Sequence, residues 1–297
     1  MLIDTHAHLY WEDYKQDFDE VIQRSLDASV TTIINVGVDV EKSKQALRLA
    51  QRINGERSQT IKFYSTIGIH PHEAVKYSAD PSVSIHQDIE KLEQVYQTNT
   101  EKVVAVGECG LDYYFRELDP SVADSKSHLD SSPPQDDTRA LQRQLFQAQI
   151  DLAKKLNLPL IVHCRDDRSK DPQNSEAWDE VLEMVSSHYG ILHCYSGLPP
   201  TTQKAMNSNF LVSFAATITY PKNEYLREAV KILPLEKIVL ETDCPFLPPQ
   251  SKRGQRNEPA NVLEIAQLIA EIKDIHLEEV ENKTSENVRK ILRLREV

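Results

Sequence analysis

Short apolar runs rich in β-branched residues alternate along the chain with longer stretches whose apolar residues recur at helical spacing. A short apolar run between polar residues is typical of a strand buried on both faces, as in a parallel sheet. The runs that meet this description are Leu2–Thr5, Thr32–Val36, Phe63–Ile69, Val103–Gly107, Leu160–Val162, Ile191–Leu192, Phe210–Phe214 and Lys237–Glu241.

The stretches between these runs follow the period of amphipathic helices, most clearly at Phe18–Leu26, Leu141–Leu156 and Val262–Ile272. Strands that alternate with helices predict βα units and a parallel sheet. Eight such units in roughly 250 residues are the size of a TIM barrel. We therefore predict an α/β fold, with a single (β/α)8 TIM barrel over residues 1–297.

An open, doubly wound sheet is the alternative architecture. Such a sheet usually places its ligand at one switch point, and a dinucleotide site follows a G-x-G-x-x-G motif. None of the predicted strands precedes that motif, and polar residues end most of the strands. The closed barrel is therefore favoured.

The segment Arg116–Thr138 interrupts the alternation of strands and helices. It lacks apolar periodicity and contains three prolines and six acidic residues. Because it follows the fourth predicted strand, we expect it on the face where the strands end. Long loops there are lids or flexible insertions, and an acidic loop insertion is the favoured interpretation.

The chain has 297 residues and a formal net charge of −12. That balance excludes a protein whose whole surface is a basic footprint for nucleic acid. The charge is uneven, however, because the loop 244–257 contains Lys252, Arg253 and Arg256 and no acid. Neither a secretory signal nor a run of ~20 apolar residues is visible, so we expect a cytoplasmic protein with no membrane partner. No obligate protein partner is evident.

Side chains that can bind metals stand at the ends of several predicted strands. Because the carboxyl ends of parallel barrel strands meet at one face, we expect these side chains to converge. A lone histidine there is more often a hydrogen-bonded core residue, but four imidazoles and two carboxylates together favour a two-metal hydrolytic site. The residues are His6, His8, Glu108, His163, His193 and Asp243.

Other polar residues near these positions have two interpretations each. Asp112 either orients a ligand or caps a turn, and Glu241 either supports a ligand or is paired in the barrel interior. The guanidinium of Arg165 suits phosphate oxygens, or it forms an ion pair with Asp166 or Asp167.

The four cysteines each directly follow one of the proposed ligands. Because successive strand residues point to opposite faces, we expect all four thiols to face away from the site. We interpret them as small, buried, reduced packing residues. They are Cys109, Cys164, Cys194 and Cys244.

Taken together, the motifs resemble those of the TatD family of metal-dependent deoxyribonucleases, within the wider amidohydrolase-like barrels. The matching segments are D-T-H-A-H-L, G-I-H-P-H, V-G-E-C-G-L-D-Y, L-I-V-H-C-R-D, H-C-Y-S-G, L-E-T-D-C-P-F-L and R-N-E-P. They run in family order from residue 3 to about residue 260. The long acidic insertion departs from the family pattern.

The resemblance implies a barrel with two divalent metal ions and exonucleolytic cleavage of DNA. By motif position, one ion would be held by His6, His8, Glu108 and Asp243. Glu108 would bridge to a second ion, which His163 and His193 would also hold. His70 and Arg165 would approach the substrate phosphate. Apart from the resemblance, the cationic charge of the loop Lys252–Arg256 favours a phosphate substrate, and we expect this loop, with Arg253 as a substrate-binding residue, to offset the phosphate charge.

We therefore predict a metal-dependent phosphodiesterase that acts on DNA or another phosphodiester, with Asp243 and Glu108 as its catalytic residues. Asp243 would orient and deprotonate the attacking water. The ions are Zn, Mn or Mg, because imidazoles suit the first two and oxygen ligands the third. Two rivals remain, a hydrolase of an amide, ester or lactone on the same site and a non-catalytic nucleic-acid-binding or scaffold barrel.

Overall fold

Eight strands form one sheet in the computed structural model, which describes residues 1–56, 60–80, 82–114 and 136–294. Every pair of neighbouring strands is parallel, and the spatial order follows the chain order. The strands are β1 Leu2–Ala7, β2 Val30–Asn35, β3 Lys62–Ile67, β4 Val103–Asp112, β5 Leu160–Arg165, β6 Gly190–Leu192, β7 Phe210–Phe214 and β8 Ile238–Leu240.

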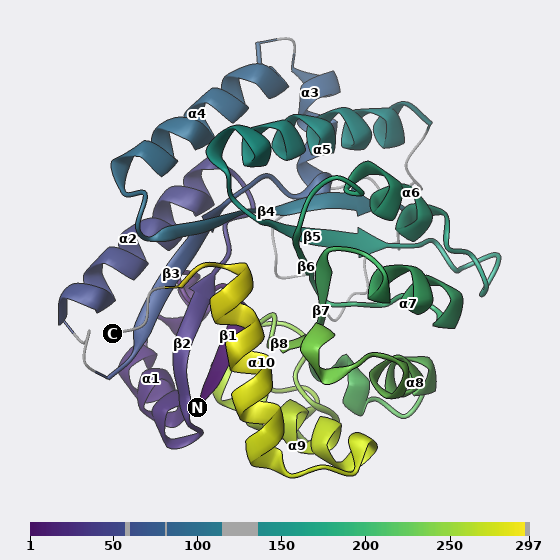
Figure 1. Ribbon diagram of the computed structural model, residues 1–297. Helices are drawn as coiled ribbons and strands as arrows, with labels where there is room; N and C mark the ends of the chain where they lie inside the picture. Colours follow the sequence, from purple (N-terminus) through teal and green to yellow (C-terminus); the bar gives the residue numbers. More distant parts are fainter. Residues whose placement is uncertain (57–59, 81, 115–135, 295–297) are drawn as a thin grey trace.

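Helices connect the strands and surround the sheet (Figure 1). The α-helices are α1 Phe18–Asp27, α2 Val40–Glu56, α3 Lys76–Ala79, α4 Ile85–Thr98, α5 Asp136–Leu156, α6 Glu176–Met184, α7 Pro199–Met206, α8 Glu224–Ile232, α9 Val262–Lys273 and α10 Leu277–Ile291. Short 3-10 helices are η1 Glu12–Tyr14, η2 Pro71–Val75, η4 Ala216–Thr219, η5 Leu235–Lys237, η6 Gln250–Lys252 and η7 Pro259–Asn261.

The sheet closes where the first strand meets the segment after the last. Ala7 forms a parallel bridge with Cys244. The amide of Asp243 donates to the carbonyl of His6 at 2.9 Å, and the hydroxyl of Thr5 donates to the carbonyl of Leu240 at 3.0 Å. This closure confirms the predicted TIM barrel, and all eight predicted strands are present.

Helix α10 lies across the end of the barrel where the strands begin (Figure 1). Ser285 donates to the carbonyl of Met1, and the amide of Asn287 donates to the carbonyls of Leu235 and Ile238. Its Val288 and Leu292 complete an apolar cluster inside the barrel with residues of the strands. The opposite end, where the strands finish, is therefore the one open to a substrate. The strand residues of this cluster include Ile3, Ile34, Val104, Ile161, Ile191, Leu211 and Val239.

Strand β4 is longer than its apolar run predicts, because its ladder with β5 continues through Gly110↔His163 to Asp112↔Arg165. Gly110 has a φ of 146°, and a Cβ atom there would lie 1.9 Å from the carbonyl oxygen of His163. Only glycine fits this close approach. The approach brings Glu108 and Asp112 beside the end of β5.

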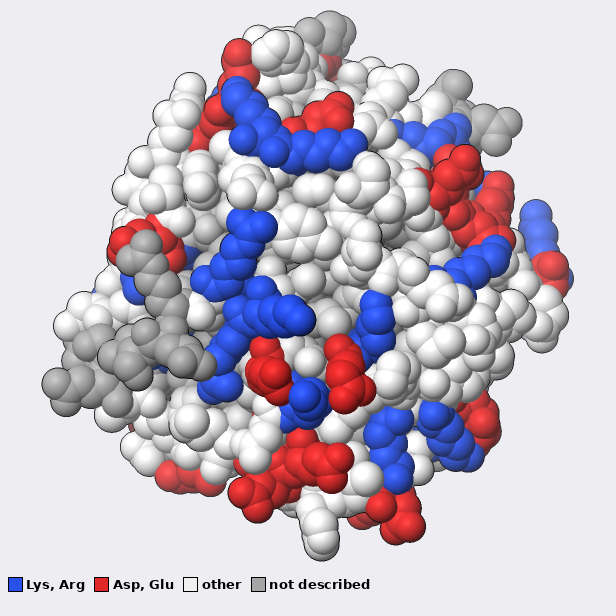
Figure 2. Space-filling view, viewed as in Figure 1, with Lys and Arg blue, Asp and Glu red and all other residues white. Residues whose placement is uncertain are grey.

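Acidic and basic side chains are interspersed on the face that carries α10 (Figure 2). The net charge of −12 therefore does not gather into one acidic field on this face. Among the helices that the structure describes, none is both long enough and apolar enough to cross a membrane. The predicted insertion 116–138 falls outside the described residues, apart from its last three, which begin α5.

Candidate metal centre

The six predicted ligands gather at the open end of the barrel. His6, Glu108 and His163 lie inside β1, β4 and β5, because these strands extend beyond their apolar runs. The other three follow the ends of β1, β6 and β8. They are His8, His193 and Asp243.

Glu108 is the centre of the cluster, because its carboxylate contacts four imidazoles. One oxygen lies 3.3 Å from Nε2 of His6. The other lies 2.8 Å from Nδ1 of His163, 3.4 Å from Nε2 of His193 and 3.5 Å from Nε2 of His70. Glu108 is 4% exposed, so this is a buried carboxylate whose neighbours are all potential metal ligands. Burying a carboxylate costs free energy unless it is paired or binds a metal, so this arrangement indicates a metal site and not ordinary core packing.

Asp243 forms a second focus beside the first. Its Oδ1 lies 3.5 Å from Nε2 of His8 and 3.7 Å from Nε2 of His6, and the two imidazole nitrogens are 3.3 Å apart. Ligand atoms of these three residues all lie within 4.8 Å of one another. His6 therefore belongs to the group that it forms with His8 and Asp243, and it also contacts the carboxylate of Glu108.

A second ligand group combines Glu108 and His163 with His70, again within 4.8 Å. The sequence prediction places His70 at the substrate phosphate, and in the structure its Nε2 lies 3.5 Å from the central carboxylate. The signal was present in the sequence, since G-I-H-P-H follows a predicted strand as the other ligand motifs do. Two adjacent groups of imidazoles and carboxylates, one around Asp243 and one around Glu108, suit a centre for divalent metals.

Hydrogen-bond acceptors behind the cluster orient its imidazoles. Nδ1 of His8 lies 3.0 Å from the carbonyl of Val36, and Nδ1 of His193 lies 2.9 Å from Glu241. The contact of His8 suits a protonated Nδ1 and leaves Nε2 free to bind a metal, the usual support for a ligating histidine. The contact of His193 with Glu241 is close, but it does not have the geometry of a hydrogen bond. Of the two interpretations of Glu241, the structure favours support of a ligand.

Asp112 combines both roles that the sequence left open. One oxygen contacts Nε2 of His72 at 2.8 Å and Nε2 of His163 at 3.2 Å. The other accepts from the backbone amide of Tyr114 at 2.9 Å, which closes a turn. The turn thus fixes a carboxylate that contacts His163.

The cluster concentrates charge in a buried place and shifts pKa values accordingly. Burial opposes ionisation of Glu108, but His70, His193 and His6 outweigh it and hold the pKa of this carboxyl well below its usual range. Burial also opposes protonation of His163, yet Asp112 and Glu108 raise its pKa to about 9. A metal ion takes the place of such protons, so its binding releases them.

The two predicted phosphate-binding arginines are exposed, and each stacks on a tyrosine. The guanidinium of Arg165 lies 4.0 Å from the ring centre of Tyr114, and that of Arg253 lies 4.5 Å from the ring of Tyr220. Asp166, one of the alternative partners of Arg165, instead pairs with Arg168 at 3.1 Å. Stacking holds these guanidinium groups in place and leaves their N–H donors for a ligand.

The basic loop supplies less free charge than its sequence indicates. Arg256 forms a bidentate pair with Asp17 at 2.6 and 2.9 Å, and its guanidinium lies 4.5 Å from the ring of Tyr14. Lys252 donates to Asn261. The charge of Arg256 is therefore already balanced by Asp17, and Arg253 is the exposed arginine of the loop.

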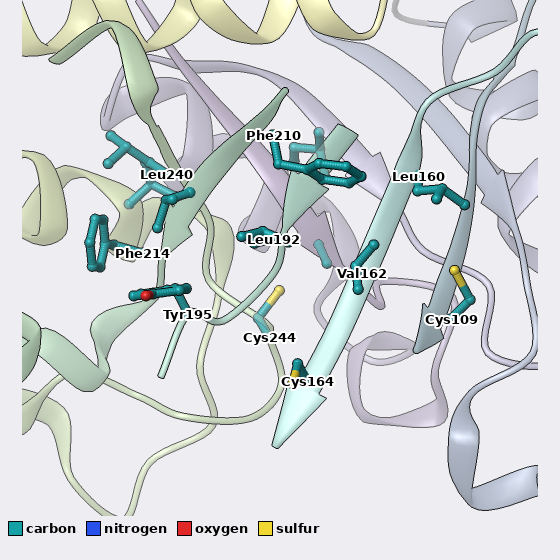
Figure 3. Packing of buried hydrophobic residues seen from close by; sticks show 14 of the residues in the cluster. Cys109, Leu160, Val162, Cys164, Leu192, Tyr195, Phe210, Phe214, Leu240 and Cys244 are labelled. Carbon is teal, nitrogen blue, oxygen red and sulfur yellow. The ribbon is translucent and has the colours of Figure 1, made fainter. Parts of the chain in front are cut away.

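The predicted place of the cysteines is confirmed for three of the four. Cys109, Cys164 and Cys244 are buried among apolar side chains (Figure 3), and burial raises the pKa of each thiol. The prediction is wrong for Cys194, whose sulfur lies within 4.8 Å of ligand atoms of His193 and Asp243. The alternation of side-chain directions along a strand does not apply to Cys194, because β6 has already ended and this residue has a φ of 42°.

Comparisons with known proteins place this arrangement among metal-dependent hydrolases. The sequence model of a family described as TatD related DNase matches residues 3–293. The uncharacterized metal-dependent hydrolase YabD of Bacillus subtilis is 34% identical over 294 residues, covering 99% of this chain and 100% of its own. The 3′-5′ ssDNA/RNA exonuclease TatD of Erwinia tasmaniensis is 27% identical, with coverage of 99% and 100%. Among solved structures, the TatD homologue YJJV of Escherichia coli superposes with a TM-score of 0.78 at 25% identity, covering 99% of this chain and 98% of its own.

Proposed function

The chain belongs to the family of TatD-related DNases and is a metal-dependent hydrolase, and from this premise we propose that it hydrolyses phosphodiester bonds of DNA. One observation carries the proposal. The carboxylate of Glu108 lies within 3.5 Å of four imidazoles, directly beside the Asp243 group, at the open end of the barrel. Nuclease relatives such as the TatD exonuclease of Erwinia tasmaniensis support DNA as the substrate.

We propose that two divalent ions share this cluster, with Glu108 contributing to both. His6, His8 and Asp243 would hold one ion, and His163 and His193 would hold the other. The imidazole-rich donor set suits Zn or Mn better than Mg. When bound, such ions polarise the phosphoryl oxygen and lower the pKa of an attacking water.

Asp243 is the residue we assign to the proton transfer. Burial opposes its ionisation, but the contact with His8 and the charges of His193 and His6 lower its pKa. The carboxylate is therefore ionised at neutral pH and can accept a proton from water held between it and the substrate. Its side chain lies at the rim of the cluster and is 15% exposed, so a substrate can reach it.

Arg165 and Arg253 would bind the phosphate on the exposed side of the cluster. Their guanidinium groups stack on Tyr114 and Tyr220, so less conformational freedom is lost when phosphate oxygens bind. His70 is the third residue that we assign to the substrate side, in addition to its contact with Glu108.

Replacing Arg165 by Ala is expected to raise KM for a short oligonucleotide roughly 10-fold or more, because charge-assisted hydrogen bonds to phosphate are lost. The change in kcat should be smaller, and the metal content should stay at the wild-type value. Arg165→Lys keeps the charge without the planar fork and should recover part of the affinity. An unchanged KM for Arg165→Ala would remove this residue from the phosphate site. Steady-state kinetics with parallel metal analysis measures all three quantities.

A substrate panel tests the proposed reaction against its rival. Single-stranded DNA, duplex DNA and RNA of one sequence are compared with a p-nitroanilide and a lactone, each with Mg, Mn, Zn and Co. We expect turnover of at least one nucleic acid, and none of the amide or lactone at a comparable rate. Hydrolysis of the amide or lactone without hydrolysis of any nucleic acid would contradict the proposal.

A further inference from the structure

Two surface grooves lie on the outside of the barrel, and each is lined by three cations. The first, the α1–α2 groove, has a volume of about 450 Å³ and is lined by residues of segments 9–18 and 45–52. The second, the α2–α4 groove, has a volume of about 360 Å³ and is lined by residues of segments 44–51 and 91–98. Both lie in the size range of ligand-binding clefts, ~300–1,000 Å³.

The α1–α2 groove adjoins the segment that directly follows His8. Its wall begins at Leu9, the residue after His8. The indole of Trp11, which also lines it, lies 5.5 Å from the ring of His8 and 5.1 Å from the ring of Phe246. A chain bound at the metal centre can therefore leave it over Trp11.

Arg48 joins the two grooves, because its side chain lines both. Figure 1 shows α1, α2 and α4 following one another around one side of the barrel, which places the grooves in sequence on the outside. Together they form one path from the rim of the metal centre across α2.

The charge of this path is opposite to that of the chain as a whole. Lys15, Arg48 and Arg52 line the first groove against one acid, Glu12. Lys44, Arg48 and Lys91 line the second, and among its lining residues, all of which the structure describes, none is acidic. Glu12 pairs with Lys15, Glu41 with Lys44 and Arg48, and Asp88 with Lys91, so five cations stand against three acids and leave an excess of two positive charges. Against a net charge of −12 for the whole chain, this local excess favours a polyanionic occupant.

Lys91 pairs at 2.9 Å with Asp88, whose side chain is only 7% exposed, whereas Arg48 has an exposed partner that a ligand can displace. Arg48 lies 3.2 Å from Glu41, and the two side chains are 65% and 58% exposed. Ion pairs this exposed contribute little, so the guanidinium can turn to a phosphate. The guanidinium of Arg52 instead lies 5.3 Å from the ring of Phe18.

Aromatic side chains stand between the cations of the first groove. Trp11 and Phe18 both line it and are partly exposed. A cationic groove with interleaved aromatic rings suits a single-stranded nucleic acid, whose unpaired bases stack while its phosphates bind the cations. Bases inside a duplex are not free to stack in this way.

We propose that the two grooves form a binding track for single-stranded nucleic acid, along which the part of the strand remote from the scissile bond lies. The inference rests on the proposed phosphodiesterase function, since that function supplies the strand at the metal centre. The track gives long strands contacts that a dinucleotide or trinucleotide does not reach. Arg48, shared by both grooves, is its most informative residue.

Arg48→Glu tests the track, and Lys290→Glu is the matched control. Lys290 is an exposed residue at the end of α10, at the opposite end of the barrel, and undergoes the same change of charge. Binding to a fluorescent 20-nucleotide phosphorothioate single strand is measured with the metal-loaded protein, because that linkage resists hydrolysis. Circular dichroism and Tm confirm that both variants fold.

We expect Arg48→Glu to weaken binding of this strand roughly 3- to 10-fold and to lower the salt dependence of Kd, since phosphate contacts are lost. Lys290→Glu should bind as the wild type does. On unmodified DNA, the ratio of kcat/KM for a 20-mer to that for a trinucleotide should fall for Arg48→Glu alone. Equal binding by Arg48→Glu and Lys290→Glu would overturn the track, and so would equal affinity of the wild type for duplex and single strand.

The binding assay separates this inference from the proposed function. Absence of any hydrolysis of unmodified DNA would contradict the phosphodiesterase, whereas the effect of Arg48→Glu on binding of the phosphorothioate strand would still decide the track. Normal hydrolysis with no effect of Arg48→Glu on binding would leave the phosphodiesterase and reject the track.

Discussion

Replacing Asp243 by Asn is expected to lower kcat for a single-stranded oligonucleotide by ~10²–10⁴-fold, the usual cost of removing a general base. The amide has nearly the same shape and keeps an oxygen that can face His6 and His8, which lie 3.7 and 3.5 Å from the carboxylate. It cannot accept the proton of the attacking water. Steady-state kinetics, with the metal content of the same preparation, measures the effect.

Asp274→Asn is the matched control for this change. Asp274 is exposed and ends α9 in the left-handed conformation, which Asn also tolerates. We expect wild-type kcat for this variant. Full metal occupancy together with near-wild-type turnover in Asp243→Asn would show that Asp243 is not the base.

Replacing Glu108 by Gln should remove both the bound metal and the activity. The carboxylate contacts four imidazoles, and each candidate ligand group among the described residues contains at least one of these imidazoles. We expect metal affinity to fall more than the ~10²-fold typical of lost supporting contacts, because a direct ligand is lost. Turnover should fall with it, and added metal should restore only a part.

Glu183→Gln makes the same chemical change at an exposed position at the end of α6 and should leave metal content and turnover unaltered. Metal content by mass spectrometry and circular dichroism separate loss of metal from loss of fold. A folded Glu108→Gln protein that keeps its metal would contradict the central place of this carboxylate.

The barrel could be predicted from the sequence because burial on both faces leaves a direct signature in each strand. A strand between the barrel interior and a helix must be apolar throughout, and each short run therefore marked one strand. The ends of the strands were harder. β4 continues to Asp112 because Gly110 allows β5 to approach closely, a backbone effect that no pattern of apolar residues reports.

The cluster was predictable as a set, whereas the partners within it were not. Histidines and carboxylates at strand ends must converge in any parallel barrel, and His6, Glu108 and His163 do so. Which atoms touch depends on strand register and rotamers. The sequence therefore did not show that His70 contacts the carboxylate of Glu108.

The prediction for Cys194 failed for a local reason, and the partner of Arg256 was missed because it is distant in the chain. Cys194 lies beyond the end of β6 in a left-handed conformation, so strand alternation did not apply to it. Arg256 is neutralised by Asp17, which precedes it by 239 positions. A count of charges in one loop cannot detect a partner that only the closed fold brings near.

Reconstitution of the metal-stripped protein tests the central claim most directly, namely that metal ions in this histidine and carboxylate cluster are required for phosphodiester hydrolysis. The wild-type protein is stripped with a chelator, divalent metal is returned in steps, and bound metal and hydrolysis of a labelled single strand are measured in each sample. The account predicts loss of turnover on stripping and its return with bound metal, up to two ions per chain. Turnover by the stripped protein at the rate of the loaded protein would contradict it.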